Sequence, residues 1–218
     1  MASRSITTQV SLLAAGTLLG YLLTSRLSSN TNPSSSIDDE ISLVLDFWFS
    51  TSSSTSYQDL HRYKWMSTDK NQSSIDAEIS SRFSALTVTL ATDANYRAAF
   101  LSSSKHPIRN LHAQIAAIIV LDQFPRHLRR LHNPSHNGVA LPPLSTTDAL
   151  ALSIASSLPP SNALTIPMQV FALMPLRHSS TLPDLKKVML EIDEMDKQVA
   201  DGDRGEPNYT HETPLPTY

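Results

Sequence analysis

The stretch RNLHAQIAAIIVLDQFPR, residues 109–126, decides the fold class, because its apolar residues recur at the spacing of a helix. One line down that helix, with intervals of four, three and four residues, is formed by Leu111, Ile115, Ile118 and Asp122. We expect a helix over about 109–124 and a turn directly after Gln123, since Pro125 cannot donate a helical hydrogen bond. The stretch therefore predicts a buried helix with an acid on its apolar side.

Further helices are predicted on both sides of this stretch. Capping residues or acids in the first turn mark the start of several of them. The residues concerned are Ser36 with Asp39, Ser73 with Asp76, and Ser145 or Thr146 with Asp148. The expected helices cover about 37–49, 73–90, 146–157, 166–179 and 182–200. No run of alternating β-branched residues is long enough for a strand, so the sequence predicts an all-α fold.

Composition excludes several classes of function. With 218 residues, 40 % of them hydrophobic, the chain can bury one sizeable core, and its net charge of -3 gives no general attraction to nucleic acid. The absence of cysteine excludes disulfides and a cysteine nucleophile, and no glycine-rich phosphate loop occurs, so no cofactor is expected. His127, His132 and His136 resemble a metal cluster, but Pro134 and Gly138 deny them one helical face, and we expect no metal.

The amino-terminal region predicts a targeting or membrane segment. Residues 6–23 contain no charge and are bracketed by Arg4 and Arg26, which is typical of a segment near the lower length limit for spanning a bilayer. We favour a single uncleaved membrane anchor within residues 1–27. Organelle import is the alternative, because the first thirty residues are rich in Ser and Thr and lack acids. The expected order is then a flexible linker at 28–36, a helical domain at 37–200 and a disordered tail at 201–218.

Asp122 stands on the helix where a leucine is expected. Burying an unpaired carboxylate costs several kcal/mol, so Asp122 needs a cation, hydrogen-bond donors or water, and Arg126 is its nearest candidate partner. The helix expected at 166–179 repeats the pattern with a histidine at its end. One face of that helix holds Phe171, Met174, Pro175 and His178. Two apolar stripes that end in ionisable groups suggest that the ends meet at a polar pocket.

This pocket defines the candidate site residues. Asp122, His178 and Ser179 are the candidate catalytic residues, as orienting acid, base and hydroxyl. An amide and an anion clamp would come from Gln123 and Arg126. The pocket lining is expected to include Trp48, Trp65 and Asp69. A local pair of Asp122 with Arg126, beside a hydrogen-bonded core histidine, explains the same residues without catalysis.

Several blocks of the chain resemble a known family. The blocks are VLDFWF (44–49), Trp65 with Asp69, IDAEISSRF (75–83), IIVLDQFPR (118–126) and FALMPLRHS (171–179), and they are similar in order and spacing to the domain-of-unknown-function family 924. The resemblance implies an all-helical bundle of antiparallel helix pairs like the tetratricopeptide-repeat superfamily, with no assigned activity, substrate or cofactor. His127 stands where family members have Asn, and Ser180 where they have Glu. A later basic block of the family is missing, so we expect a copy truncated at the carboxyl terminus.

Two functional hypotheses follow. The first is a membrane-tethered helical scaffold that binds a protein or peptide between helix pairs. The second is a hydrolase-like enzyme that uses Asp122 and His178 with Arg126 or Ser179. The distance between the Asp122 carboxylate and the His178 ring discriminates between them, because the enzyme requires the two groups to meet. Whether the chain is an enzyme stays open at the level of sequence.

Overall fold

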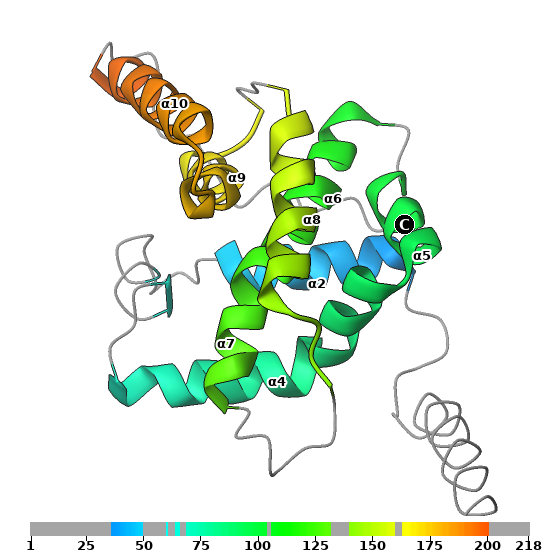
Figure 1. Ribbon diagram of the computed structural model, residues 1–218. Coiled ribbons are helices and arrows are strands. Elements are labelled where there is room, and N and C mark those ends of the chain that lie inside the picture. The colour runs from blue at the N-terminus through cyan, green and yellow to red at the C-terminus, as the bar shows by residue number, and fades with distance from the viewer. Residues whose placement is uncertain are drawn as a thin grey trace, which may run out of the picture. The chain divides into compact units, whose positions relative to one another are not determined.

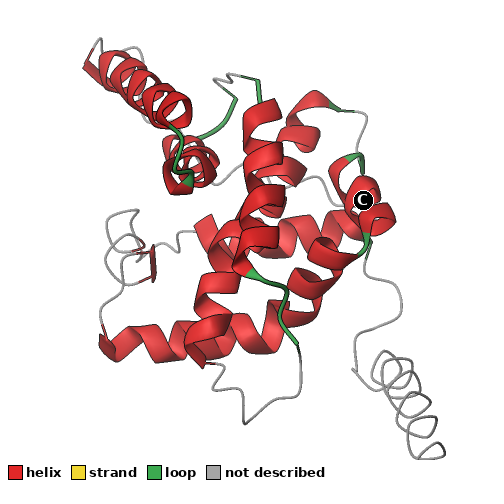
Figure 2. Ribbon diagram, in the orientation of Figure 1, coloured by secondary structure: helices red, strands yellow, loops and turns green. Residues whose placement is uncertain are grey.

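The computed structural model describes residues 36–49, 60, 64–65, 69–103, 106–131, 140–159 and 163–200. Within these ranges the regular elements are helices and there is no strand, as Figure 2 shows. The all-α prediction is confirmed, while the likeness to tetratricopeptide repeats stays a prediction. The expected anchor, linker and tail lie outside the described residues. None of the described helices is long and apolar enough to cross a bilayer.

The helices follow one another along the chain as Figure 1 shows. In order they are α2 (Ile37–Phe49), α4 (Asp69–Thr92), α5 (Ala94–Leu101), α6 (Pro107–Ile118), the π-helical segment η2 (Ile119–Gln123), α7 (Phe124–Leu131), α8 (Leu144–Ser157), α9 (Ile166–His178) and α10 (Leu182–Ala200). Each of the six helices expected from the sequence overlaps one of these. The short helix α5 was not predicted; it begins after Asp93, whose carboxylate accepts a hydrogen bond from the Tyr96 backbone at 2.9 Å.

The core is built around α6 and η2. Five consecutive residues, Ala117 to Leu121, are 0 % exposed, because α6 and η2 together contact α2, α4, α5, α8 and α9. The apolar line predicted on this stretch is confirmed: Leu111 is half-buried, and Ile115 and Ile118 are fully buried. An all-round apolar helix is stable only where other helices surround it.

Aromatic rings fill the space between α2, α7 and α9. Trp48 is 0 % exposed, and its ring centroid lies 5.6 Å from that of Phe124 and 5.5 Å from that of Phe171. The indole of Trp65 donates a hydrogen bond to the Trp48 carbonyl at 3.0 Å, and Lys64 donates to the carbonyl of Phe47. Residues 64–65 thus satisfy carbonyls that the end of α2 leaves without helical partners.

The expected turn after Gln123 is wrong. The chain stays helical through Pro125 and α7 ends only at Leu131. The π-helical turn of η2 explains this difference, because the backbone N–H of Phe124 donates to the carbonyl of Ile119, five residues back. The wider turn changes the hydrogen-bond register just before Pro125, so the proline stands at the second position of α7, where a missing N–H costs little.

Two predicted helix starts are also wrong. Helix α4 begins at Asp69, so Ser73 and Asp76 lie inside it rather than at its cap. Helix α8 begins at Leu144 after Pro143, without a side-chain cap. The acids that were interpreted as capping residues, Asp76 and Asp148, are therefore available for contacts with other helices.

Candidate functional site

The Asp122 carboxylate and the His178 ring meet. Asp122 is held by η2 and is 0 % exposed, and its Oδ1 lies 2.8 Å from Nδ1 of His178 at the end of α9. The histidine side chain is 28 % exposed, so one partner faces the core and the other reaches solvent. The sequence predicted both the buried acid and its meeting with the histidine.

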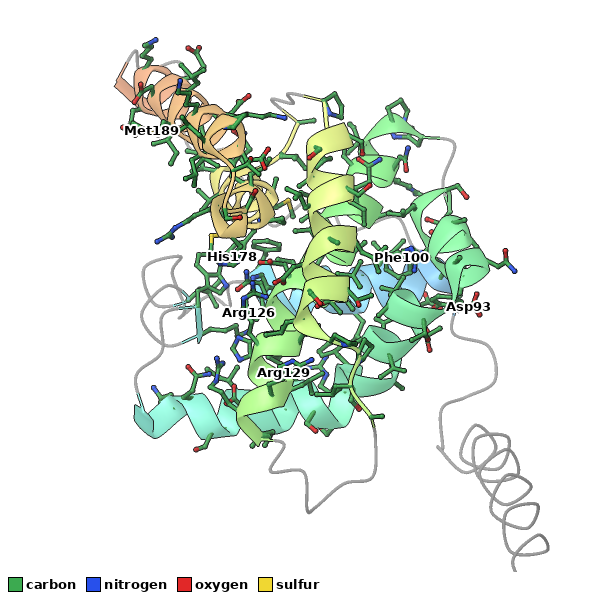
Figure 3. All side chains as sticks on the ribbon, viewed as in Figure 1. Asp93, Phe100, Arg126, Arg129, His178 and Met189 are labelled. Atoms are coloured by element: carbon green, nitrogen blue, oxygen red, sulfur yellow. The ribbon has the colours of Figure 1, made fainter. Side chains whose placement is uncertain are left out.

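Asp122 and Arg126 both contact the same nitrogen, Nδ1, of the His178 ring. Nδ1 lies between the Asp122 carboxylate at 2.8 Å and Nη2 of Arg126 at 3.1 Å, and Figure 3 shows His178 and Arg126 side by side. A carboxylate only accepts hydrogen bonds and a guanidinium only donates them. A protonated Nδ1 donates to Asp122, whereas an unprotonated Nδ1 accepts from Arg126. The shorter contact favours the first tautomer, in which the lone pair of a neutral ring is on Nε2.

Arg126 links three helices at this point. Its Nη1 donates to the backbone carbonyl of Asp122 at 2.9 Å and to Oδ1 of Asp148, on α8, at 2.8 Å. Its Nη2 lies 3.7 Å from the Asp122 carboxylate. The expected contact between Asp122 and Arg126 is therefore present, although it forms along a continuous helix and not through a turn. Asp148 was not among the expected site residues; nothing in the sequence pairs two residues 22 positions apart.

Two other candidates lie beside this pair. The side-chain amide of Gln123 donates to Oδ2 of Asp122 at 2.5 Å. Ser179 donates its hydroxyl to Oδ2 of Asp184 at 2.5 Å, and no hydrogen bond between Ser179 and His178 is found in the described part of the chain. Hydrogen bonds from Ser179 and then Thr181 lower the pKa of Asp184, so this serine ties α9 to the start of α10.

Two of the three predicted lining residues, Trp48 and Trp65, lie together against Phe171. Trp48 lies in the aromatic core, and its indole Nε1 is buried without a hydrogen-bond acceptor among the described residues. Trp65 contacts Phe171, with ring centroids 5.1 Å apart, and so lies against the helix that carries His178. Asp69 is the first residue of α4, and its side chain lies outside the description.

Residues 44–213 match the family model described as "Bacterial protein of unknown function (DUF924)". The chain belongs to that family. The resemblance drawn from the five sequence blocks is thus confirmed. Neither the curated proteins nor the solved structures include a match to the chain.

This DUF924 protein holds a second cluster of an acid, a histidine and an arginine. Asp76 of α4 is 2 % exposed, and its Oδ1 lies 2.7 Å from Nδ1 of His127 on α7. The Arg130 guanidinium donates to both oxygens of the same carboxylate, with Nε to Oδ2 at 2.9 Å and Nη2 to Oδ1 at 3.0 Å. Gln72 adds a bond to Oδ1 at 2.8 Å. A two-pronged arginine pair of this kind holds two helices in a fixed register.

Burial and charge shift the pKa values in this second cluster. Burial, and then the charge of Arg130, lower the pKa of His127, against the opposing effect of Asp76. Burial favours the neutral form of Asp76, but hydrogen bonds from Arg130, Gln72 and His127 outweigh it, and the pKa of Asp76 is lowered. The cluster therefore holds a charged carboxylate beside a neutral histidine. The sequence did not indicate this cluster, because Ser73 and Asp76 resemble a helix cap.

Neither cluster has the composition of a metal site in this DUF924 protein. Among the residues described by the structure, no three His, Cys, Asp or Glu side chains are grouped to hold an ion. Each cluster instead places an arginine next to the acid and the histidine, where a cation would be repelled. What the first cluster offers chemically is a histidine with an oriented ring and a free Nε2.

Proposed function

We propose that this protein is a hydrolase-like enzyme in which His178 is the general base and Asp122 orients it. The observation that supports this proposal is the 2.8 Å contact between Asp122 Oδ1 and His178 Nδ1, with the acid fully buried and the histidine partly exposed. A buried carboxylate on Nδ1 fixes the tautomer that has its lone pair on Nε2, which is the arrangement a general base requires.

The proposed reaction uses water as the nucleophile. Nε2 of His178 takes a proton from water, and the water oxygen bonds to an electrophilic carbon or phosphorus of the substrate. The bond from that atom to the leaving group then breaks, and the histidine returns the proton to the leaving group. Asp122 stabilises the imidazolium that exists between these steps. Ser179 has no part in this scheme, because its hydroxyl is bonded to Asp184. The positive charge of Arg126 is balanced by an ion pair with Asp148. The role of Arg126 in this scheme is therefore to hold the His178 ring in position.

Incubation of the purified full chain with fractionated metabolite pools tests this proposal. We expect the wild-type protein to hydrolyse a component of at least one pool, and His178→Gln and Asp122→Asn to reduce the rate about 100-fold or more, as for loss of a general base. Unchanged helical circular dichroism and an unchanged unfolding midpoint serve as controls for the variants. Lys197→Gln, at an exposed site on α10, is the matched variant that should keep full activity.

We propose as a second function that α9 and α10 form a binding face for protein. Of the nine large hydrophobic residues that are exposed in the described part of the chain, seven lie on these two helices. They are Ile166, Val170, Leu182, Leu185, Met189, Leu190 and Ile192. Exposed apolar residues concentrated on one part of a surface are typical of an interaction site. This function fits the expected scaffold and is compatible with the enzyme.

We also propose, from sequence alone, that residues 6–23 tether the chain to a membrane, with organelle import as the alternative. The tether predicts that the full chain sediments with membranes after a carbonate wash. A chain with Leu12→Lys and Leu19→Lys should then remain in the supernatant. Release of the wild-type chain by the same wash contradicts the anchor.

A further inference from the structure

Helix α10 has one side buried and an apolar stripe beside it in solvent. It packs against α9, as Figure 1 shows, and two of its residues, Val188 and Met195, are each 8 % exposed. The stripe consists of Leu182 (63 % exposed), Leu185 (38 %), Met189 (66 %) and Ile192 (44 %). An outward face of a helix in a soluble domain is normally polar. The stripe therefore leaves apolar surface in water that α9 does not cover.

The spacing of the stripe is that of a coiled coil. Intervals of three, four and three residues put Leu182 and Met189 at one core position of a heptad, and Leu185 and Ile192 at the other. Residues at these two positions form the seam along which a second helix packs. Met189 lies near the middle of α10 (Figure 3), so a partner helix aligned end to end would be centred close to it. The stripe covers the first eleven residues of α10, which has 19.

The charges on α10 are divided between its two halves. Residues 182–190 hold one acid and two lysines, whereas residues 191–200 hold four acids and one lysine. A parallel pair of such helices would set like-charged halves side by side, and an antiparallel pair sets opposite charges together. Charges that flank a seam decide the partner and its direction. The pattern is thus complementary to itself in the antiparallel direction.

We propose that the stripe of α10 packs along α10 of a second copy of this chain, antiparallel and related by a twofold axis. End-to-end overlap sets Met189 against the partner's Ile192, Lys186 beside the partner's Asp193, and Leu182 and Leu185 against the last two turns of the partner's helix. Lys186 and Asp193 form no ion pair in the part of the chain that the structure describes, so both are available for this contact. The proposal rests on the binding face of the second proposed function and is independent of the chemistry of His178.

Sedimentation equilibrium of the full chain over a concentration series tests the pairing. We expect a monomer–dimer equilibrium for the wild type and a monomer for Met189→Lys over the same range. Ile108→Lys is the matched control: Ile108 is a large hydrophobic residue that is 43 % exposed on α6, outside the binding face, and this variant should keep the wild-type Kd. Dimerisation that Met189→Lys leaves intact, or that Ile108→Lys abolishes equally, overturns the proposal.

A charge exchange tests the direction of the pair. Lys186→Glu places the new glutamate beside the partner's Asp193 twice in the dimer, and we expect Kd to rise about tenfold. Adding Asp193→Lys in the same chain reverses both charges and should restore the wild-type Kd. Failure of this rescue overturns the antiparallel register. A wild-type chain that stays monomeric, yet loses binding to a peptide library on Met189→Lys, overturns the self-pairing alone and retains the binding face.

Discussion

At the scale of single residues, Asp122 is where burial and charge oppose each other most directly. Its carboxylate is fully buried, so the loss of His178 leaves a charge in the core with only Gln123 and Arg126 as partners. We expect His178→Ala to lower the free energy of unfolding by about 1–3 kcal/mol, since a buried acceptor loses its donor. Urea unfolding at pH 7 measures this change.

A double-mutant cycle separates this effect from the packing of the histidine. Once Asp122→Asn has removed the charge, truncation of His178 no longer strands a carboxylate. The double variant should therefore be more stable, by about 0.5–1 kcal/mol or more, than the sum of the single changes predicts. Lys197→Gln, at an exposed position of α10, is the control and should stay within about 0.5 kcal/mol of wild type. Additive single effects contradict the coupling.

The contrast between Asp122 and Asp148 shows what sequence can predict about single residues. Asp122 was recognisable because helical periodicity put a polar residue among apolar ones, and burial then required a partner. Asp148 binds Arg126 at 2.8 Å, but its position in the chain resembles that of an ordinary first-turn acid. The pair of Asp76 and His127 is likewise separated by 51 residues. Periodicity predicts which face of a helix is buried, but it does not predict which other helix packs against that face.

At the scale of elements, the two buried prolines inside helices differ in their surroundings. Pro125 follows the π-helical turn η2, whereas Pro175 lies in the interior of the α-helix α9. A proline in an α-helix interior costs about 3 kcal/mol, because it removes a hydrogen bond and clashes with the preceding turn. We expect Pro175→Ala to raise the free energy of unfolding relative to Pro125→Ala by about 1–3 kcal/mol, measured by urea unfolding.

Each proline serves as the control for the other, because both rings are buried and both substitutions remove the same carbon atoms. Equal effects of the two substitutions would show that η2 does not accommodate Pro125. The sequence predicted a break at Pro125 for the same steric reason. It could not predict the wider turn, since the local rule gives the cost of a proline in an α-helix and not the alternative register that avoids it.

At the scale of the whole molecule, two acid–histidine clusters join helices that are distant in sequence. The first ties η2 and α7 to α8 and α9, and the second ties α4 to α7. Both clusters contain residues of one continuous run, η2 with α7. That run therefore connects α4 with α8 and α9. The sequence identified the run as the centre of the fold, while the helices that it joins were visible only in three dimensions.

The second cluster makes the stability of the whole molecule dependent on pH. Burial lowers the pKa of His127 and of His112 below the ordinary value of 6.5, so the unfolded chain takes up protons before the folded chain does. The free energy of unfolding should therefore fall as pH decreases below about 6.5. The pKa of Asp76 is lowered below the ordinary 3.8, which adds a second loss of stability as pH falls through that value.

Urea unfolding at pH 7.5, 6.5, 5.5, 4.5, 3.5 and 2.5 checks both steps of this acid dependence. We expect His127→Gln to flatten the fall between pH 7 and 5, because glutamine can still donate to Asp76 but binds no proton. Adding His112→Gln should flatten that part further and leave the fall below pH 4, which belongs to Asp76. Stability that rises on acidification between pH 7 and 5, or a slope that the double variant leaves unchanged, contradicts the assignment of the first step to these two buried histidines.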